Sequence, residues 1–84
     1  FLSLNIMVKN WTESNGFLSR EFKFDNLQEA FAFMTRVAFL AEELKHHPNW
    51  KNVYNQVSIH LTTHDAGEVT HKDYELANAI NKLI

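Results

Sequence analysis

The chain has 84 residues, a formal net charge of -2 and no cysteine. This length supports one domain with one modest hydrophobic core and excludes a second domain, while the lack of cysteine excludes disulfides and thiolate chemistry. The absence of a basic block argues against direct nucleic-acid binding, and no apolar run is long enough to cross a membrane. We therefore expect a soluble intracellular domain that is held together by packing, and self-association remains open as a further source of stability.

The first predicted elements are two strands joined by a tight turn. Residues 5–13 contain spaced apolar side chains, and residues 17–24 alternate, with one face formed by Leu18, Arg20, Phe22 and Phe24. Between them lies Asn15-Gly16, a pair that tolerates the positive φ angles of a hairpin turn. We therefore expect the two strands to pair antiparallel.

A long helix is predicted to follow, with Asp25 as its N-cap and Gln28 as the reciprocal capping residue. Its expected buried face consists of Leu27, Ala30, Phe31, Met34, Val37, Ala38, Ala41 and Leu44. Phe33, Phe39 and Leu40 widen this apolar arc beyond one stripe. Two explanations are open: the helix lies deep on a sheet, or part of it forms a subunit contact. Pro48 ends the helix, because its ring disfavours helical geometry at His47.

The remaining elements complete an α+β domain that spans residues 1–84. A short extended piece is expected near residues 51–54, followed by a half-buried strand over residues 56–62. Thr70 then begins a second helix with Asp73 at the reciprocal capping position, and its expected buried face is Leu76, Ala77, Ile80, Leu83 and Ile84. Antiparallel strands interrupted by helices predict a sheet with the helices on one face.

The five histidines offer the most obvious titratable chemistry near neutral pH. We interpret His60 and His71 as solvated surface residues. His46 and His47 stand at a helix C-terminus, where the helix dipole favours a protonated imidazole by about 0.3 to 1 kcal/mol, so a structural role remains open for at least one of them. Glu42 stands one helical turn before His46, where its carboxylate is expected to orient that imidazole.

A metal site is not expected. Adjacent histidine side chains diverge, and the sequence lacks the paired histidines at i and i+4 that a helical zinc site uses. We therefore predict no metal.

These residues together form a pattern that resembles the signature of the pterin-4a-carbinolamine dehydratases. Glu42 is followed after three residues by His46-His47-Pro48, after five more by Tyr54, after nine more by His64 and after eight more by Asp73. The likeness extends over most of the chain, from FDNLQEAF at residues 24–31 to ELANAI at residues 75–80. Members of that family commonly carry an additional helix before the first strand, and here it is expected to be missing or shortened.

The resemblance implies a single domain with a four-stranded antiparallel sheet, helices packed on one face, and assembly into homodimers or homotetramers. It also implies an enzyme, a hydro-lyase that removes water from 4a-hydroxytetrahydropterin and gives quinonoid dihydropterin in tetrahydrobiopterin recycling. An alternative is an interaction module, because animal members also serve as dimerisation cofactors of a transcription factor. That role would use the apolar surface of the long helix at residues such as Phe33, Phe39 or Leu40. We expect a cytoplasmic protein. The alternative role with a transcription factor would place it in the nucleus as well.

By the same resemblance, His46, His47 and His64 are assigned to catalysis, with His47 and His64 favoured for proton transfer to the departing hydroxyl. His46 is expected to act as a base or to bind the ring. The residues expected to contact the substrate are Glu42, His46, His47, Pro48, Trp50, Thr63, His64 and Asp65. Core packing is an equally good explanation for Trp50 and the favoured one for Tyr54, and for Asp73 capping is favoured over catalysis.

Overall fold

The computed structural model describes residues 8–84, in which two helices and four strands alternate. In chain order these are β1 (Thr12–Ser14), β2 (Phe17–Lys23), α1 (Leu27–Leu44), β3 (Asn49–Val53), β4 (Gln56–Leu61) and α2 (His71–Asn81). Residues 1–7 lie outside the described part. The expectation about an additional N-terminal helix falls outside it, as does the first part of the strand predicted over residues 5–13.

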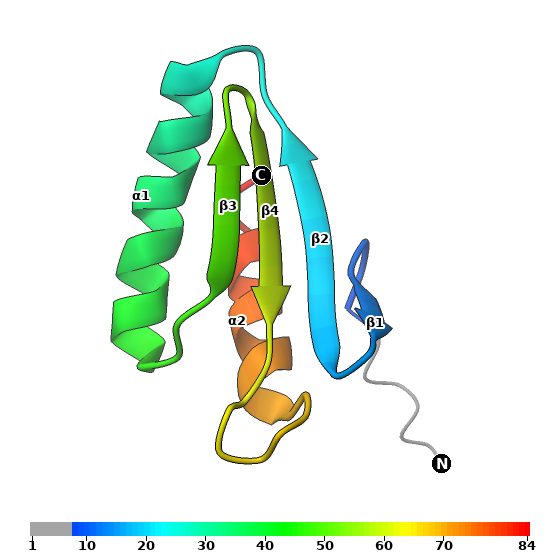
Figure 1. Ribbon diagram of the computed structural model, residues 1–84. Coiled ribbons are helices and arrows are strands. Elements are labelled where there is room, and N and C mark those ends of the chain that lie inside the picture. The colour runs from blue at the N-terminus through cyan, green and yellow to red at the C-terminus, as the bar shows by residue number, and fades with distance from the viewer. Residues whose placement is uncertain (1–7) are drawn as a thin grey trace.

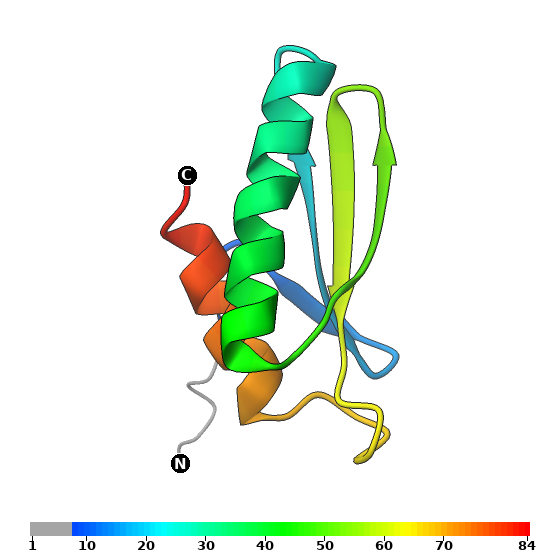
Figure 2. The same cartoon turned by 90° about the vertical axis from the view of Figure 1, so that its left-hand side faces the viewer.

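The four strands form one antiparallel sheet in the order β1-β2-β4-β3 (Figure 1). Strand β4 therefore lies between β2 and β3, although it follows β3 in the chain. Both helices cover the same face of this sheet, and no helix formed by residues 8–84 lies against the opposite face (Figure 2). The predicted α+β fold class is confirmed.

The β1-β2 hairpin has the turn that the sequence predicts. Ser14 pairs with Phe17, so that Asn15 and Gly16 form a two-residue loop with φ angles of 53° and 84°. Strand β1 is nevertheless only three residues long. The reason is that the chain just before it turns, with the Trp11 amide donating to the Val8 carbonyl at 3.1 Å, and the predicted strand is therefore wrong over residues 8–11.

The core lies between the sheet and the two helices. Alternate residues of β2 and β4 point into it, since a strand directs successive side chains to opposite faces. The buried side chains of this cluster are Val8, Trp11, Leu18, Phe22, Ala30, Phe33, Val37, Val57, Ile59, Leu61, Leu76, Ala77 and Ile80. Phe33 stacks between Phe22 and Phe24, with ring centroids 4.7 and 5.0 Å away. Phe33 therefore belongs to the core and is not available as an exposed contact residue.

Helix α1 begins one residue later than predicted. The N-cap is Asn26, whose side-chain oxygen accepts from the Glu29 amide at 2.9 Å, so that the assignment of this role to Asp25 is wrong. The buried stripe of the helix runs through Ala30, Phe33, Val37 and Ala41. Several residues of the predicted buried face or arc are instead exposed: Leu27, Phe31, Ala38 and Phe39.

Two further expectations about packing are wrong. Tyr54 is exposed, because it occupies the β3-β4 turn with a φ of 51° and its side chain leaves the core. Ile84 is also exposed, since α2 ends at Asn81 and the chain beyond it no longer follows the helical face. The extended piece expected near residues 51–54 is a full edge strand, β3, that pairs with β4 from Asn49 to Val53.

Helix α2 is attached to the start of the chain through polar contacts. The Trp11 indole nitrogen donates to Asn81 Oδ1 at 2.8 Å, and the side-chain Nδ2 of Asn81 donates to the Lys9 carbonyl at 3.1 Å. The Tyr74 hydroxyl donates to Glu13 Oε1 at 2.5 Å. This hydrogen bond to a carboxylate is the main reason why the pKa of Tyr74 is raised to about 12, with desolvation and the negative charge of Glu13 adding to it.

The raised pKa of Tyr74 predicts a loss of stability in alkali. Its folded value of about 12 lies above the ordinary value of 10.0, so the stabilising contribution is complete below pH 10 and is lost as the pH rises towards 12. We expect the free energy of unfolding of the wild type to fall relative to that of Tyr74→Phe across this window, as measured by urea denaturation. Parallel pH profiles of the two proteins would contradict the prediction.

Candidate active site

The C-terminal turn of α1 determines where the two adjacent histidines point. Helix α1 ends at Leu44, and Lys45 follows in the left-handed conformation with a φ of 54°. The His46 amide donates back to the Ala41 carbonyl at 3.0 Å, which closes the helix end. Pro48 then leads into β3 at Asn49. The reversal at Lys45 directs the imidazoles of His46 and His47 to different partners.

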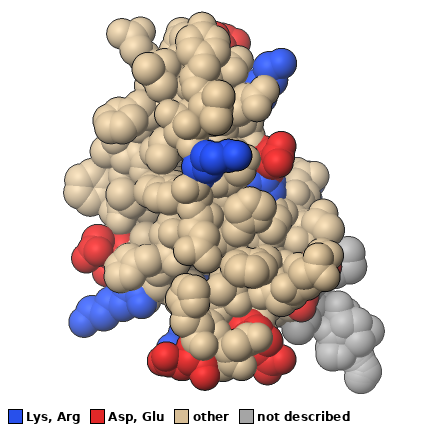
Figure 3. Space-filling view, viewed as in Figure 1, with Lys and Arg blue, Asp and Glu red and all other residues tan. Residues whose placement is uncertain are grey.

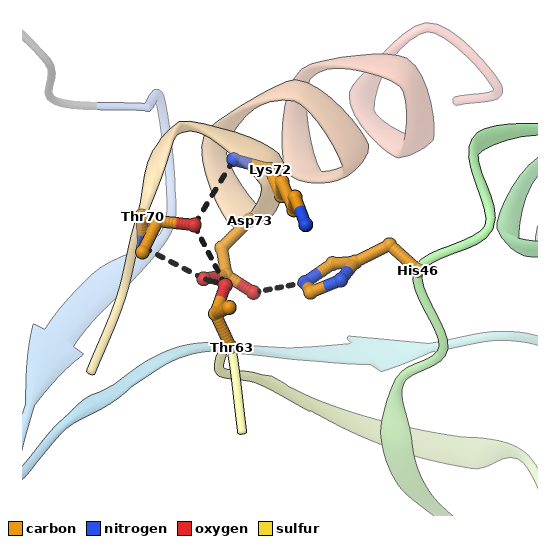
Figure 4. A network of polar contacts seen from close by, with 5 residues as sticks. All are labelled: His46, Thr63, Thr70, Lys72 and Asp73. Atoms are coloured by element: carbon orange, nitrogen blue, oxygen red, sulfur yellow. Dashed lines mark hydrogen bonds and ion pairs between the residues drawn. The ribbon is translucent and has the colours of Figure 1, made fainter. Parts of the chain in front are cut away.

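His46 contacts the buried carboxylate of Asp73 at the start of α2 (Figure 4). The distance between His46 Nε2 and Asp73 Oδ1 is 2.5 Å, and Asp73 is fully buried while the His46 side chain is 11% exposed. A carboxylate only accepts hydrogen bonds, so Nε2 carries the proton in this pair. Among residues 8–84, His46 Nδ1 has no hydrogen-bond partner, and it is the ring nitrogen left for a ligand.

Asp73 is also the acceptor at the end of a chain of hydrogen bonds (Figure 4). Its Oδ2 accepts from the Thr63 hydroxyl and from the Thr70 amide, both at 2.8 Å. Because Thr63 donates to Asp73, it accepts from the Thr70 hydroxyl at 2.7 Å, which in turn accepts from the Lys72 amide at 3.3 Å. The predicted capping box of Thr70 and Asp73 is confirmed. The sequence analysis missed the second role of Asp73, which is to fix the orientation of His46.

His47, and not His46, is the partner of Glu42. His47 Nε2 lies 3.0 Å from Glu42 Oε2, and both side chains are well exposed. The expected contact between Glu42 and His46 is therefore wrong. It assumed that the helix continues through His46, whereas the left-handed Lys45 moves His46 off the helical face.

His64 lies on the loop that follows β4. Thr63 begins this loop and pairs with Glu68, and the amide of Gly67 returns to the Thr63 carbonyl at 2.9 Å. Gly67 has a φ of 69°, a conformation that favours glycine. The loop is closed on itself by these bonds and presents His64 and Asp65 at its exposed tip.

The three predicted catalytic histidines converge on one hollow of about 320 Å³. Its lining residues come from the end of α1, the start of β3, the loop after β4 and the first turn of α2: Lys45, His46, His47, Pro48, Asn49, Thr62, Thr63, His64, Asp65 and Lys72. The volume is at the lower end of the range for small-molecule sites. Three imidazoles around one hollow can both donate and accept protons near neutral pH.

Two predicted substrate-binding residues do not line this hollow. Glu42 reaches it only through His47. Trp50 is half-buried and packs against the core from β3, which agrees with the packing alternative. Four lining residues were not predicted: Lys45, Asn49, Thr62 and Lys72. The sequence did contain a signal for the two lysines, because Lys45 directly precedes His46 and Lys72 directly precedes Asp73.

The other two histidines lie elsewhere. His60 points to the open face of the sheet, where its Nδ1 and the Ser19 hydroxyl are 2.7 Å apart. Two larger hollows of about 460 and 590 Å³ adjoin this pair, but each contains one imidazole and not three. His71 is exposed, as predicted. In Figure 3 basic and acidic side chains lie in the upper half of the open sheet face, and further acidic side chains gather at the lower end of the molecule, near the β4-α2 loop.

Neither a metal cluster nor a membrane span is found in the described part of the chain. Among residues 8–84, no group of three or more His, Cys, Asp or Glu side chains is arranged to hold a metal ion. No helix there is both long and apolar enough to cross a membrane.

Comparison with known proteins identifies the family. The profile of the family described as "Pterin 4 alpha carbinolamine dehydratase" matches residues 2–83. The chain belongs to the pterin-4a-carbinolamine dehydratase family. A "Putative pterin-4-alpha-carbinolamine dehydratase" of Prochlorococcus marinus (strain NATL2A) is 53% identical to it over 75 residues, which cover 89% of this chain and 79% of the relative.

Solved structures of this family share the fold. The crystal structure of a "transcriptional coactivator/pterin dehydratase from Brucella Melitensis" has a TM-score of 0.85 and 38% identity, and the match covers 89% of this chain and 82% of that one. A "pterin dehydratase-like protein" described as a "RuBisCO assembly factor in the alpha-carboxysome" has a TM-score of 0.76 and 25% identity, with 88% of each chain covered. The fold of the family therefore occurs in proteins with different roles.

Proposed function

We propose that this chain dehydrates 4a-hydroxytetrahydropterin to quinonoid dihydropterin by histidine acid-base catalysis, without a metal or an organic cofactor. The observation that carries the proposal is the convergence of His46, His47 and His64 on one hollow. Family membership supports the same reaction. We further propose that the enzyme acts in the cytoplasm, where it serves tetrahydrobiopterin recycling.

The reaction needs one proton donor and one proton acceptor on a planar ring. The C4a–O bond breaks with its electron pair on oxygen, which takes a proton from the donor and leaves as water. The N5–H proton passes to the acceptor, and the C4a–N5 double bond forms. Imidazole has an unperturbed pKa of about 6.5 and supplies both groups near neutral pH. Positioned acid-base groups contribute roughly 10² to 10⁴ in rate.

We assign the proton transfer to the departing hydroxyl to His47 and His64. His46 acts as the base or binds the ring, and Asp73 holds its orientation through Nε2. A carboxylate behind an imidazole is a common device for fixing which ring nitrogen faces the substrate. Backbone groups of the lining residues Pro48, Thr63 and Asp65 supply hydrogen bonds to the amide-like edge of the pterin.

We also propose that the chain assembles into homodimers or homotetramers. The exposed apolar side chains of α1 support this, since Phe31 is 63% and Phe39 is 73% exposed. The same face supports the alternative function, in which the chain acts as an interaction partner of another protein. Two proteins of similar structure are named as a coactivator and as an assembly factor, and these names support a role in protein interaction as the second candidate function.

The dehydration rate tests the proposal directly. We expect the wild type to accelerate the loss of water from 4a-hydroxytetrahydropterin over the spontaneous rate, followed by ultraviolet absorbance, and to do so equally in the presence of a chelator. A folded wild type without any acceleration would exclude the dehydratase function and leave the interaction module as the better explanation.

A further inference from the structure

Two lysines line the candidate active site without an ion-pair partner among residues 8–84. Lys45 adopts the left-handed conformation at the end of α1, where glycine or asparagine is the usual residue. Lys72 lies in the first turn of α2, where the helix dipole disfavours a positive charge. The dipole of α1 favours the charge of Lys45 at its C-terminus, whereas the charge of Lys72 is not explained by helix stability. Both lysines line the same hollow.

The two lysines approach the hollow from different elements. Lys45 comes from the end of α1 and Lys72 from the start of α2. In Figure 4 the Lys72 side chain extends towards the His46 ring. Within residues 8–84, no carboxylate lies within 4.0 Å of either ammonium group, so neither charge is neutralised by an ion pair there. Both are exposed and free to contact a ligand.

The charge of the hollow is therefore unbalanced. In the described part of the chain, its only acidic lining residue is Asp65, against the two lysines and three imidazoles. The nearby carboxylates of Glu42 and Asp73 are each bonded to an imidazole. The histidines serve the proton transfers of the reaction, and the pterin ring is neutral. The two ammonium groups therefore have no function in the reaction itself.

We propose that Lys45 and Lys72 recognise an anionic substituent, a carboxylate or a phosphate, on the side chain of the pterin. This inference rests on the proposed function and extends its substrates from biopterin, whose side chain is uncharged, to pterins with an anionic side chain. The imidazoles act on the ring, while the lysines at the rim bind the charged end of its substituent. Lysine suits this task because its ammonium group is a flexible point charge with three donors.

Binding of stable oxidised pterins tests the inference. We compare 6-carboxypterin, which is anionic, with 6-hydroxymethylpterin, which is neutral, by quenching of pterin fluorescence at low salt. Surface charge pairs change affinity by about three- to five-fold each, so we expect 6-carboxypterin to bind about ten-fold more tightly. Added salt should reduce this preference, because exposed charges are screened.

Variants separate the lysines from the rest of the site. We expect the Lys45→Gln, Lys72→Gln double variant to bind both pterins with similar affinity, because it lacks the two charges that distinguish them. Lys51→Gln, at an exposed lysine of β3 outside the hollow, is the matched control and should keep the preference. Lys72→Arg should also keep it, since the charge is retained.

The outcomes distinguish this inference from the proposed function. Binding of both pterins with equal affinity by the wild type, or a preference that persists in the double variant, would overturn the role of the lysines and leave the dehydratase proposal standing. Binding of neither pterin by the folded wild type would overturn both.

Discussion

His64→Ala is expected to reduce the dehydration rate by roughly 10² to 10⁴, the usual contribution of a positioned acid-base group. The reason is that His64 is one of the three imidazoles at the hollow and is favoured as the group that protonates the departing hydroxyl. The side chain is exposed at the tip of a loop, and surface substitutions usually change stability by no more than about 0.5 kcal/mol. Turnover measured by ultraviolet absorbance and unfolding measured by circular dichroism would separate the two effects.

The control for His64 is another exposed histidine. His71→Ala removes an imidazole that does not line the hollow, so turnover should stay within about two-fold of the wild type. A His64→Ala variant as active as His71→Ala would remove His64 from the mechanism. A variant that unfolds would instead show that His64 has a structural role that its exposure does not suggest.

Asp73→Ala is expected to have the largest effect on stability. Its fully buried carboxylate accepts hydrogen bonds from Thr63, from the Thr70 amide and from His46. The substitution leaves three donors without their acceptor and removes half of the capping box, at a cost of about 3 kcal/mol. For a domain of this size, that corresponds to a fall of roughly 12 to 24 °C in Tm.

Turnover should also fall in Asp73 variants, because His46 loses the group that fixes its orientation. Asp73→Asn provides the more precise test, since it keeps the size of the side chain but turns one acceptor into a donor. We expect it to remain folded at 25 °C with reduced turnover. Glu75→Ala removes an exposed acid of the same helix and should change neither property. Unchanged stability in Asp73→Ala would contradict the assignment of the buried network.

Much of the fold could be predicted from local sequence signals. The Asn15-Gly16 turn and the capping box of Thr70 and Asp73 are specified by the residues themselves, because few residue types suit those backbone conformations and contacts. The buried face of α1 was predicted less well. Phe31 and Phe39 fit a helical apolar pattern and are nevertheless exposed, since periodicity shows that a face is apolar but not what covers it.

The candidate site was predicted through the family resemblance, and its details depended on tertiary structure. The spacing of His46, His47 and His64 could not show by itself that they meet, because α1 and the loop after β4 come together only in the fold. The sequence predicted that Glu42 contacts His46, whereas in the structure it contacts His47, and the reason is physical. One left-handed residue, Lys45, moves His46 towards Asp73 and leaves Glu42 to His47.

Histidine side-chain NMR would test the central claim most directly. Long-range ¹H–¹⁵N spectra resolve the ring nitrogens of each histidine, and a stable product-like pterin such as 7,8-dihydrobiopterin can be titrated into the protein. If His46, His47 and His64 form the pterin site, their ring resonances should shift together with one dissociation constant, while those of His60 and His71 remain in place. Shifts at His60 with the other three unchanged would contradict the claim and move the ligand to the open face of the sheet.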